Sequence, residues 1–276
     1  MFDLTSYEKE ATDRDMGGLD LESSRLFDLR GNKALVTGAS RGIGFAAAIA
    51  LAEAGADLIV CSRNLSTLGE VVKAIEVTGR RALAFPVDVS EPKSVRNMVA
   101  EAYRAFGNVD ILVNSAGQIS RKAATEWSVQ EWAESIDVNL RGTFLCCQEV
   151  GKNMILRKDG GKIINVASLL SAIGVPNIVP YASSKGGVAS LTRSLAVEWA
   201  KYGINVNAVG PGYVRTELTR ALQEDAPRSS SIVSRIPIGR WGTPQDLKGA
   251  FIFLASHASD YITGQIIYVD GGWTAG

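Results

Sequence analysis

The sequence predicts a doubly wound α/β fold, in which helices cover both faces of a parallel seven-stranded sheet. From Asn32 onward, short β-branched runs alternate with longer amphipathic stretches. Most of the short runs are apolar with little alternation, which is typical of strands buried on both faces. The connections are short and leave no room for a second domain. We therefore expect one domain over residues 28–276, preceded by a polar extension over residues 1–27.

The expected elements can be read off in order along the chain. The runs expected to form strands are Lys33–Thr37, Asp57–Ser62, Arg81–Val87, Asp110–Asn114, Lys162–Val166, Ile204–Val209 and Gln265–Val269. The stretches expected to form helices are Gly44–Ala54, Leu65–Thr78, Pro92–Phe106, Val129–Arg157, Tyr181–Tyr202 and Pro244–Ala255. The fourth stretch is long enough to form two helices.

The bulk composition narrows the classes of partner. Among 276 residues, 29 Lys and Arg balance 29 Asp and Glu, and this zero net charge argues against a nucleic acid or an anionic membrane as partner. No apolar run approaches the ~20 residues of a membrane span. Three cysteines without a CxxC pair and a single histidine indicate a reducing, cytoplasmic environment and no metal site.

A glycine-rich loop, Thr37–Gly44, follows the first expected strand and opens the first expected helix. Glycines at these points allow a tight turn, close approach of the backbone to a pyrophosphate, and close packing of the helix on the strand. The helix N-terminus adds free N–H groups and the positive end of a dipole. The loop therefore predicts a dinucleotide site of the Rossmann type, with an ordinary strand-to-helix turn as the alternative.

The residues at the end of the second strand indicate which dinucleotide is bound. Rossmann units that take NAD carry an acid about 20 positions past the loop, where it accepts hydrogen bonds from the ribose 2′-hydroxyl. Here the strand ends Val60–Arg63 without an acid, and Arg41 lies in the loop itself. Two guanidinium groups suit a 2′-phosphate, so NADP(H) is the preferred cofactor and NAD(H) stays open. The alternative is that Arg41 and Arg63 are solvated surface charges.

A series of short motifs follows the loop in a fixed order. With the loop, they are Thr37–Gly44 (TGxxxGxG), Asn114–Gly117 (NSAG), Asn139, Ser168, Tyr181–Lys185 (YxxxK), Pro211–Gly212 and Val269–Gly272. In this order and spacing they resemble the classical short-chain dehydrogenase/reductase family over about residues 28–276. Ser115 stands where the family has the second Asn of NNAG. That Asn stabilises the sheet in the family, so we expect activity to be retained.

Tyr181 and Lys185 lie four residues apart, so they share one helix face and the ammonium can approach the phenol. A free tyrosine titrates near ~10, and a neighbouring cation is expected to lower that pKa toward the working range. Ser168 is expected to hydrogen-bond the substrate oxygen while hydride passes to or from the adjacent carbon. The resemblance further implies that Lys185 holds the nicotinamide ribose and that Asn139 holds a water relaying protons to Lys185. An ordinary helix face is the alternative for this spacing.

The resemblance also implies which residues contact the cofactor. Asp88 and Val89, after the third strand, resemble the pair that flanks the adenine ring, and residues 211–216 resemble the loop that covers the nicotinamide carboxamide and the phosphates. The full implied set is Gly38, Ser40, Arg41, Ile43, Gly44, Arg63, Asp88, Val89, Asn114, Ala116, Gly117, Tyr181, Lys185, Pro211, Gly212, Val214 and Thr216.

Residues 217–240 occupy the position of the family's substrate lid. They are mostly charged or small and polar, whereas a long aliphatic ketone calls for large apolar side chains. The strings Arg228–Gly242 and Ser168–Ser171 resemble those of gluconate and deoxygluconate dehydrogenases, and Arg121 or Lys122 is placed to meet a carboxylate. A sugar acid or polyol is therefore the first choice of small-molecule carbonyl or alcohol substrate, and a 3-oxoacyl thioester reductase is the alternative.

Two other function classes fit the same fold. One is a catalytically silent dinucleotide-sensing regulator, and the other is a scaffold subunit that docks through its N-terminal extension. The presence of Asn139, Ser168, Tyr181 and Lys185 argues for the enzyme. The resemblance implies a homotetramer, with Tyr261–Gly276 as its interface-forming end.

Overall fold

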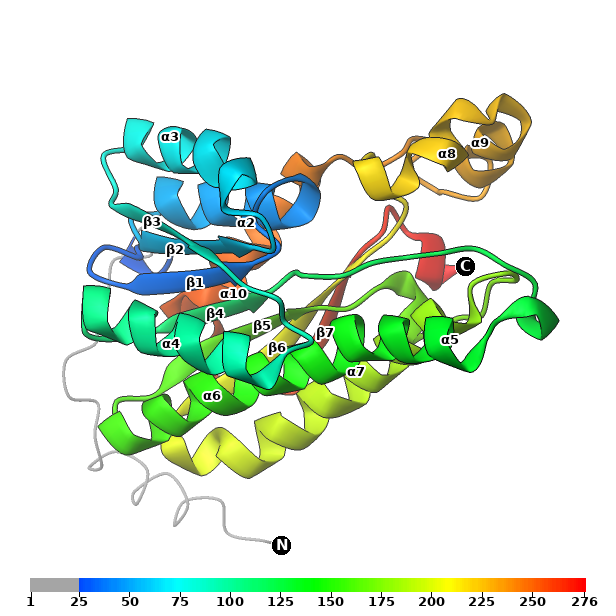
Figure 1. The fold of residues 1–276 in the computed structure, drawn as a ribbon. Coiled ribbons are helices and arrows are strands. Elements are labelled where there is room, and N and C mark those ends of the chain that lie inside the picture. Colours follow the sequence, from blue (N-terminus) through cyan, green and yellow to red (C-terminus); the bar gives the residue numbers. More distant parts are fainter. Residues whose placement is uncertain (1–24) are drawn as a thin grey trace, which may run out of the picture.

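The computed structural model describes residues 25–276 and places seven parallel strands in one sheet (Figure 1). The strands are β1 (Lys33–Thr37), β2 (Asp57–Ser62), β3 (Ala82–Pro86), β4 (Ile111–Asn114), β5 (Gly161–Val166), β6 (Ile204–Pro211) and β7 (Ile266–Val269). Their order is β3-β2-β1-β4-β5-β6-β7, so the chain builds one half of the sheet and then returns to build the other. The predicted doubly wound sheet is confirmed, and its strand order reverses between β1 and β4.

Helices form a layer on each face of this sheet, and two short helices lie outside both layers (Figure 1). The helices are α2 (Gly42–Glu53), α3 (Gly69–Val77), α4 (Pro92–Phe106), α5 (Val129–Ile136), α6 (Gly142–Arg157), α7 (Val179–Trp199), α8 (Arg220–Glu224), α9 (Ala226–Val233) and α10 (Lys248–Ala255). One layer contains α2, α3 and α10, and the other contains α4, α6 and α7. The two outlying helices are α8 and α9.

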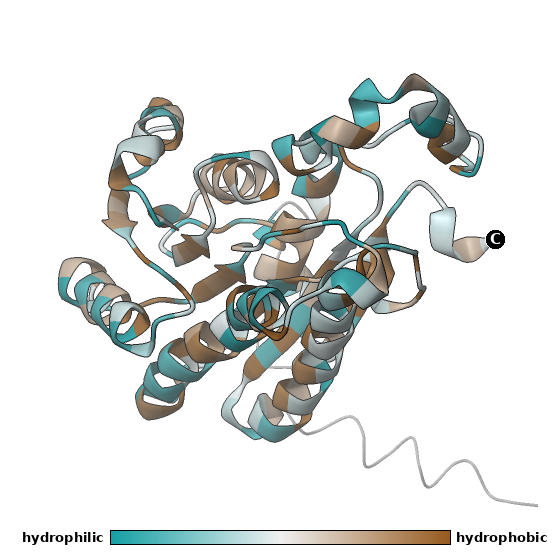
Figure 2. Cartoon of the chain, turned by 45° about the vertical axis from the view of Figure 1, so that its right-hand side comes forward, coloured by the Kyte–Doolittle hydropathy of each residue, from teal (hydrophilic) through white to brown (hydrophobic). Residues whose placement is uncertain are grey.

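Successive strand residues point into opposite layers, and both sides are apolar. In β1, Val36 packs in the cluster that contains Leu51 of α2 and Phe251 of α10. Its neighbour Leu35 packs in the cluster that contains Met98 of α4. Hydrophobic colouring accordingly follows the strands and the helix faces that meet them (Figure 2). This burial on both faces is why the strands lack the apolar–polar alternation of a half-exposed sheet.

The long stretch Val129–Arg157 forms α5 and α6, which are joined by a π-helical turn, Asp137–Arg141. A capping box starts α5, in which Glu131 N–H donates to the Ser128 hydroxyl. The π turn adds a residue to the helical repeat and turns Asn139 into the interior, where its exposure is 0%. The prediction that this stretch forms two helices is therefore confirmed. The turn between them contains Asn139, one of the predicted site residues.

Several element ends differ from the sequence-based expectations. The stretches expected as Leu65–Thr78 and Pro244–Ala255 each begin with a 3-10 turn before α3 and α10. The helix expected from Tyr181 begins at Val179, because Pro180 is accommodated in its first turn. Residues 220–233, for which we expected no helix, form α8 and α9. Of the expected N-terminal extension, residues 1–24 lie outside the described residues.

The packing of α6 on α7 predicts an unusual response to a glycine substitution. A Cβ added at Gly151 would lie 2.7 Å from ring atoms of buried Trp199, whereas a Cβ at Gly249 in α10 meets nothing within 4 Å. Helix propensity favours Ala over Gly by roughly 0.5–1 kcal/mol, so Gly249→Ala should be stabilising by about that amount. Gly151→Ala should instead lower the free energy of unfolding by about 1–3 kcal/mol through overpacking. Urea titrations measure both, and equal stabilisation by the two variants would contradict this account of the packing.

Candidate active site

Two adjoining cavities lie at the carboxyl ends of the strands, where ligands bind in open α/β sheets. The first has a volume of about 420 Å³ and opens beside the ends of β1 and β2. The second has a volume of about 380 Å³ and is bounded by β5, β6 and the lid helices α8 and α9. Ile43, Val166, Tyr181, Thr216 and Leu218 line both cavities, so the two are continuous.

The glycine-rich loop is pressed against neighbouring backbone where only glycine fits. Gly38 has a φ of +67°, and a Cβ there would lie 2.7 Å from the amide nitrogen of Ala116. A Cβ at Gly44 would lie 2.2 Å from the carbonyl oxygen of Gly38. Among the described residues, no side chain caps the N-terminus of α2. Its first N–H groups therefore remain available to an anion in the first cavity.

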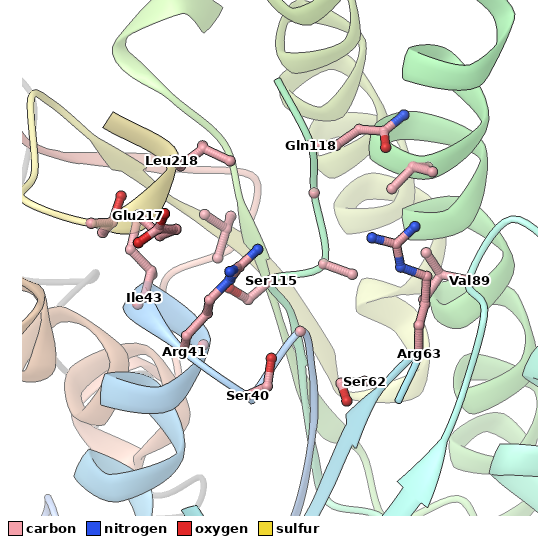
Figure 3. Close-up of a pocket in the computed structure, with 18 of the residues that line it drawn as sticks. Ser40, Arg41, Ile43, Ser62, Arg63, Val89, Ser115, Gln118, Glu217 and Leu218 are labelled. Atoms are coloured by element: carbon pink, nitrogen blue, oxygen red, sulfur yellow. The ribbon is translucent and has the colours of Figure 1, made fainter. Parts of the chain in front are cut away.

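Arg41 and Arg63 flank the first cavity, from the loop before α2 and from the end of β2 respectively (Figure 3). Neither guanidinium has an ion pair with a carboxylate of residues 25–276. Asp88, which also lines this cavity, accepts hydrogen bonds from the N–H (2.9 Å) and hydroxyl (2.6 Å) of Ser90. The guanidinium groups of Arg41 and Arg63 therefore line the same cavity, as predicted, and no Asp or Glu stands beside Arg63 at the end of β2.

The other residues expected at the cofactor divide between the cavities. Those lining the first are Gly38, Ser40, Arg41, Ile43, Gly44, Arg63, Asp88, Val89, Ala116, Gly117, Tyr181, Lys185 and Thr216. Pro211, Gly212 and Val214 line the second. Asn114 lines neither, because its side chain lies within the sheet and donates to Asn165 Oδ1 at 2.9 Å. Ser62, Asn64 and Thr67 also line the first cavity. They were not predicted, although they are close to Arg63 in the sequence.

Ser168, Tyr181 and Lys185 meet where the two cavities join. Ser168 follows β5, Tyr181 lies in the first turn of α7, and Lys185 lies one turn later. Ser168 and Tyr181 both line the second cavity, and the Ser168 hydroxyl accepts the N–H of Leu170 at 3.1 Å. The Lys185 Nζ lies 5.6 Å from the centroid of the Tyr181 ring and donates to the carbonyl oxygen of Val166 at 2.6 Å. The structure thus brings together the three residues that the sequence singled out.

The electrostatics of Tyr181 differ from the sequence-based expectation. Burial raises the pKa of its phenol, and the Ser168 hydrogen bond and the charge of Arg121 lower it without cancelling that effect. Burial also lowers the pKa of the Lys185 ammonium to about 8. The expectation that Lys185 lowers the pKa of Tyr181 is therefore wrong for this structure. Removal from water disfavours the charged form of both groups, and the cation that acts on the phenol is Arg121.

Asn139 lines neither cavity but holds the segments around them. Its Oδ1 accepts the N–H of Gln118 at 2.8 Å, and its Nδ2 donates to the Gln118 carbonyl at 2.9 Å. The same Nδ2 donates to the hydroxyl of Ser184, the neighbour of Lys185, at 3.2 Å. The side chain therefore ties the loop after β4 to α7, on which the Tyr181 and Lys185 side chains are carried.

The second cavity contains side chains that the sequence left undecided or missed. Arg121 lines it, whereas Lys122 pairs with Glu131 at 2.5 Å. Tyr213 also lines it and packs against two indole rings, with centroids 5.5 Å from Trp241 and 4.7 Å from Trp273. The only sequence signal for Tyr213 was its place between Gly212 and Val214, both of which were expected in the site.

The lid is more apolar on its inner side than its composition suggests. Leu222 of α8 and Ile232 of α9 are buried and line the cavity. Arg228, Ser231 and Arg235 line the same cavity from this segment. The segment is amphipathic, so its apolar residues gather on one side when α8 and α9 form. The expectation of a polar lid therefore holds for the average composition but not for the inner face.

Two further properties of residues 25–276 bear on the site. No helix in this part of the chain has the length and apolar character needed to cross a membrane. Over the same residues, His, Cys, Asp and Glu side chains nowhere gather in groups of three that could hold a metal ion.

Known proteins resemble this chain in both sequence and fold. A family model described as enoyl-(acyl carrier protein) reductase matches residues 38–274. The 2-dehydro-3-deoxy-D-gluconate 5-dehydrogenase of Dickeya dadantii is 45% identical over 249 residues, covering 90% of this chain and 98% of that protein. The gluconate 5-dehydrogenase of Gluconobacter oxydans is 39% identical over 249 residues, covering 90% and 97% respectively.

Solved structures agree with these matches. A short-chain type dehydrogenase/reductase from Mycobacterium marinum superposes with a TM-score of 0.88 at 41% identity, covering 91% of this chain and 98% of that one. A gluconate 5-dehydrogenase from Burkholderia cenocepacia, in complex with NADP and tartrate, gives a TM-score of 0.89 at 42% identity, covering 92% and 100%. With the sheet order and the motifs in place, the chain belongs to the short-chain dehydrogenase/reductase family and is an oxidoreductase that acts on CH–OH groups.

Proposed function

We propose that this chain transfers hydride between NADP(H) and a secondary carbinol or carbonyl carbon of a sugar acid, with Tyr181 as proton donor and acceptor. The observation that supports the proposal is that Tyr181 lines both cavities, with Lys185 beside it in the first and Ser168 in the second. The relatives from Dickeya dadantii and Gluconobacter oxydans are named as dehydrogenases of gluconate-type acids. The solved gluconate 5-dehydrogenase from Burkholderia cenocepacia holds the hydroxy acid tartrate. The alternative, a 3-oxoacyl thioester reductase, is less favoured because arginines line the second cavity.

The first cavity suits a nicotinamide dinucleotide. Its glycine cradle lets a pyrophosphate approach the backbone, and the open N-terminus of α2 favours an anion. Arg41 and Arg63 provide donors for a ribose 2′-phosphate, which supports NADP(H) over NAD(H). Relatives of known structure also hold NADP. Lys185 lines the same cavity beside Tyr181, which supports its expected contact with the nicotinamide ribose.

Each side chain at the junction of the two cavities has a separate role in the proposed proton transfer. Ser168 donates a hydrogen bond to the substrate oxygen and holds it beside Tyr181. During carbonyl reduction the Tyr181 hydroxyl gives its proton to that oxygen, and during oxidation the phenolate takes the proton back. The bound nicotinamide supplies or accepts the hydride at the adjacent carbon. Lys185 exchanges the proton with Tyr181, and Asn139 fixes the turn of α7 that carries both residues.

Three expectations about organisation remain predictions. We propose that residues 28–276 form one catalytic domain and that residues 1–27 are an extension of it. We also propose a homotetramer. Large apolar side chains stay exposed on two of the helices that cover one face of the sheet, with Leu156 of α6 at 77% and Val197 of α7 at 83% exposure. The predicted cytoplasmic location rests on composition alone.

Replacing Tyr181 by Phe tests the reaction. The substitution keeps the ring and removes the exchangeable proton, so gluconate-dependent NADPH formation should fall at least ~10²-fold. NADPH binding, followed by fluorescence titration, should change little because the phenol is not its main anchor. Near-normal turnover by a folded Tyr181→Phe protein would contradict the assigned role. If the unmodified protein reduces 3-oxoacyl thioesters better than it oxidises any sugar acid, the substrate assignment is wrong.

Replacing Arg63 by Asp tests the cofactor assignment. Losing one charge-assisted hydrogen bond to the 2′-phosphate should raise the Kd for NADPH about tenfold or more. The new carboxylate can accept from the ribose hydroxyl of NADH, so the preference should move toward NADH. High salt should weaken NADPH binding more than NADH binding. An unmodified protein that already prefers NADH, or an unchanged ratio in Arg63→Asp, would show that Arg63 does not read the phosphate.

The pKa of Lys185 gives a stability prediction for the cofactor-free protein. Its pKa is about 8 in the fold against a usual 10.5, so the unfolded chain binds more protons between these values. The destabilisation by buried Lys185 is complete below pH 8 and is relieved as the pH rises to 10.5. Relative to Lys185→Met, the unfolding free energy of the unmodified protein should therefore rise with a slope approaching about 1.4 kcal/mol per pH unit. Urea titrations from pH 7.5 to 10 measure this slope, and parallel curves would refute it.

A further inference from the structure

The second cavity has a one-sided charge distribution. Three arginines, Arg121, Arg228 and Arg235, line it from the loop after β4 and from the lid. No Asp or Glu is among the described residues that line it. A cavity with several cations and no acid favours an anionic occupant, because the occupant then supplies the missing charge.

These three guanidinium groups also lack acidic partners elsewhere. None forms an ion pair with a carboxylate in the described part of the chain, although nearby Arg220 and Arg240 pair with Glu217 and Asp246. The acid closest in sequence to Arg228 is Asp225, whose carboxylate instead accepts the backbone N–H of Arg228 at 3.1 Å and caps α9. The donors of the three guanidinium groups therefore remain available for a bound ligand.

The three charges form two poles. Burial lowers the pKa of Arg121, and the charge of Arg228 lowers it further, so these two guanidinium groups lie close enough to repel one another. Arg235 forms a separate pole, because it lies seven residues beyond Arg228, just past the end of α9 and roughly 10 Å farther along the axis at about 1.5 Å per residue. Its Cζ stacks 4.3 Å from the centroid of the Trp273 ring. Stacking engages the face of a guanidinium and leaves its in-plane N–H donors free for a carboxylate.

Tyr213 lines the same cavity as the three arginines. Burial raises the pKa of its phenol, and the charges of Arg121, Arg235 and Arg228 all lower it. Of the three charges, that of Arg121 also acts on the phenol of Tyr181, so we assign the reacting end of the substrate to the pole that contains Arg121.

We propose that the substrate is a hydroxy diacid, with one carboxylate at the Arg121–Arg228 pole and a second at Arg235. This inference rests on the proposed function and specifies its substrate class. A monoacid would neutralise only one of three cations, whereas a diacid neutralises two and occupies both poles. The aldaric acids, which carry a carboxylate at each end of a polyhydroxy chain, have this chemistry.

Glucarate and gluconate provide a matched test, because they share their carbon configuration and differ only in whether carbon 6 is a carboxylate or a CH₂OH group. Binding to the NADP⁺ complex is measured by calorimetry, and turnover by NADPH formation. Glucarate should bind at least about tenfold more tightly than gluconate and should have the higher kcat/KM. Its binding should also weaken more steeply with added salt.

Single substitutions separate the two poles. Arg235→Gln should weaken glucarate about tenfold while changing gluconate less than about twofold, because only the diacid reaches that pole. Arg228→Gln should weaken both acids, because both use the pole near Tyr181. Arg96→Gln, at an exposed position of α4 outside both cavities, controls for the loss of one positive charge and should change neither.

The outcomes distinguish this inference from the proposed function. Equal or tighter binding of gluconate, or equal weakening of both acids by Arg235→Gln, would overturn the diacid proposal. If gluconate is still oxidised in that case, the proposed function stands. If neither acid binds nor is oxidised while a neutral alcohol or an acyl thioester is turned over, both proposals fail.

Discussion

The buried side-chain amide of Asn139 is the contact on which the arrangement of the site depends. It satisfies both the N–H and the C=O of Gln118 and also reaches Ser184, so three segments distant in sequence meet at one side chain. With 0% exposure, an unsatisfied amide at this position would be costly, which holds the arrangement in place. The π-helical turn between α5 and α6 aims this residue inward. The position of α7, and with it Tyr181 and Lys185, follows from these contacts.

Desolvation is the largest influence on the pKa of Tyr181 and of Lys185 at the junction of the cavities. It favours the neutral phenol of Tyr181 and lowers the pKa of Lys185, which brings the ammonium closer to exchange at neutral pH. The counteracting positive charge comes from Arg121, which lines the substrate side of the site. An anion bound at Arg121 would screen that charge, so substrate recognition and the acidity of Tyr181 are electrostatically coupled.

Arginines without acidic partners among residues 25–276 characterise both cavities. Arg41 and Arg63 line the first cavity, and Arg121, Arg228 and Arg235 line the second. The aromatic group of Tyr213, Trp241 and Trp273 gives the lid a rigid support, since Arg235 rests on one of these rings. The C-terminal segment thereby reaches the substrate cavity through packing, although its sequence motif suggested only a role in assembly.

The sheet, the glycine loop, the two arginines of the first cavity and the spacing of Ser168, Tyr181 and Lys185 could all be predicted from the sequence. These features depend on local periodicity, turn chemistry and short spacings, which neighbouring residues encode. Three features could be seen only in the folded chain: Arg121 rather than Lys122 lines the second cavity, Tyr213 lines it too, and the Asn114 side chain lies within the sheet. The sign of the Tyr181 pKa shift was also decided there. Burial and long-range charge depend on segments far apart in the chain, and no local pattern records which of them will meet.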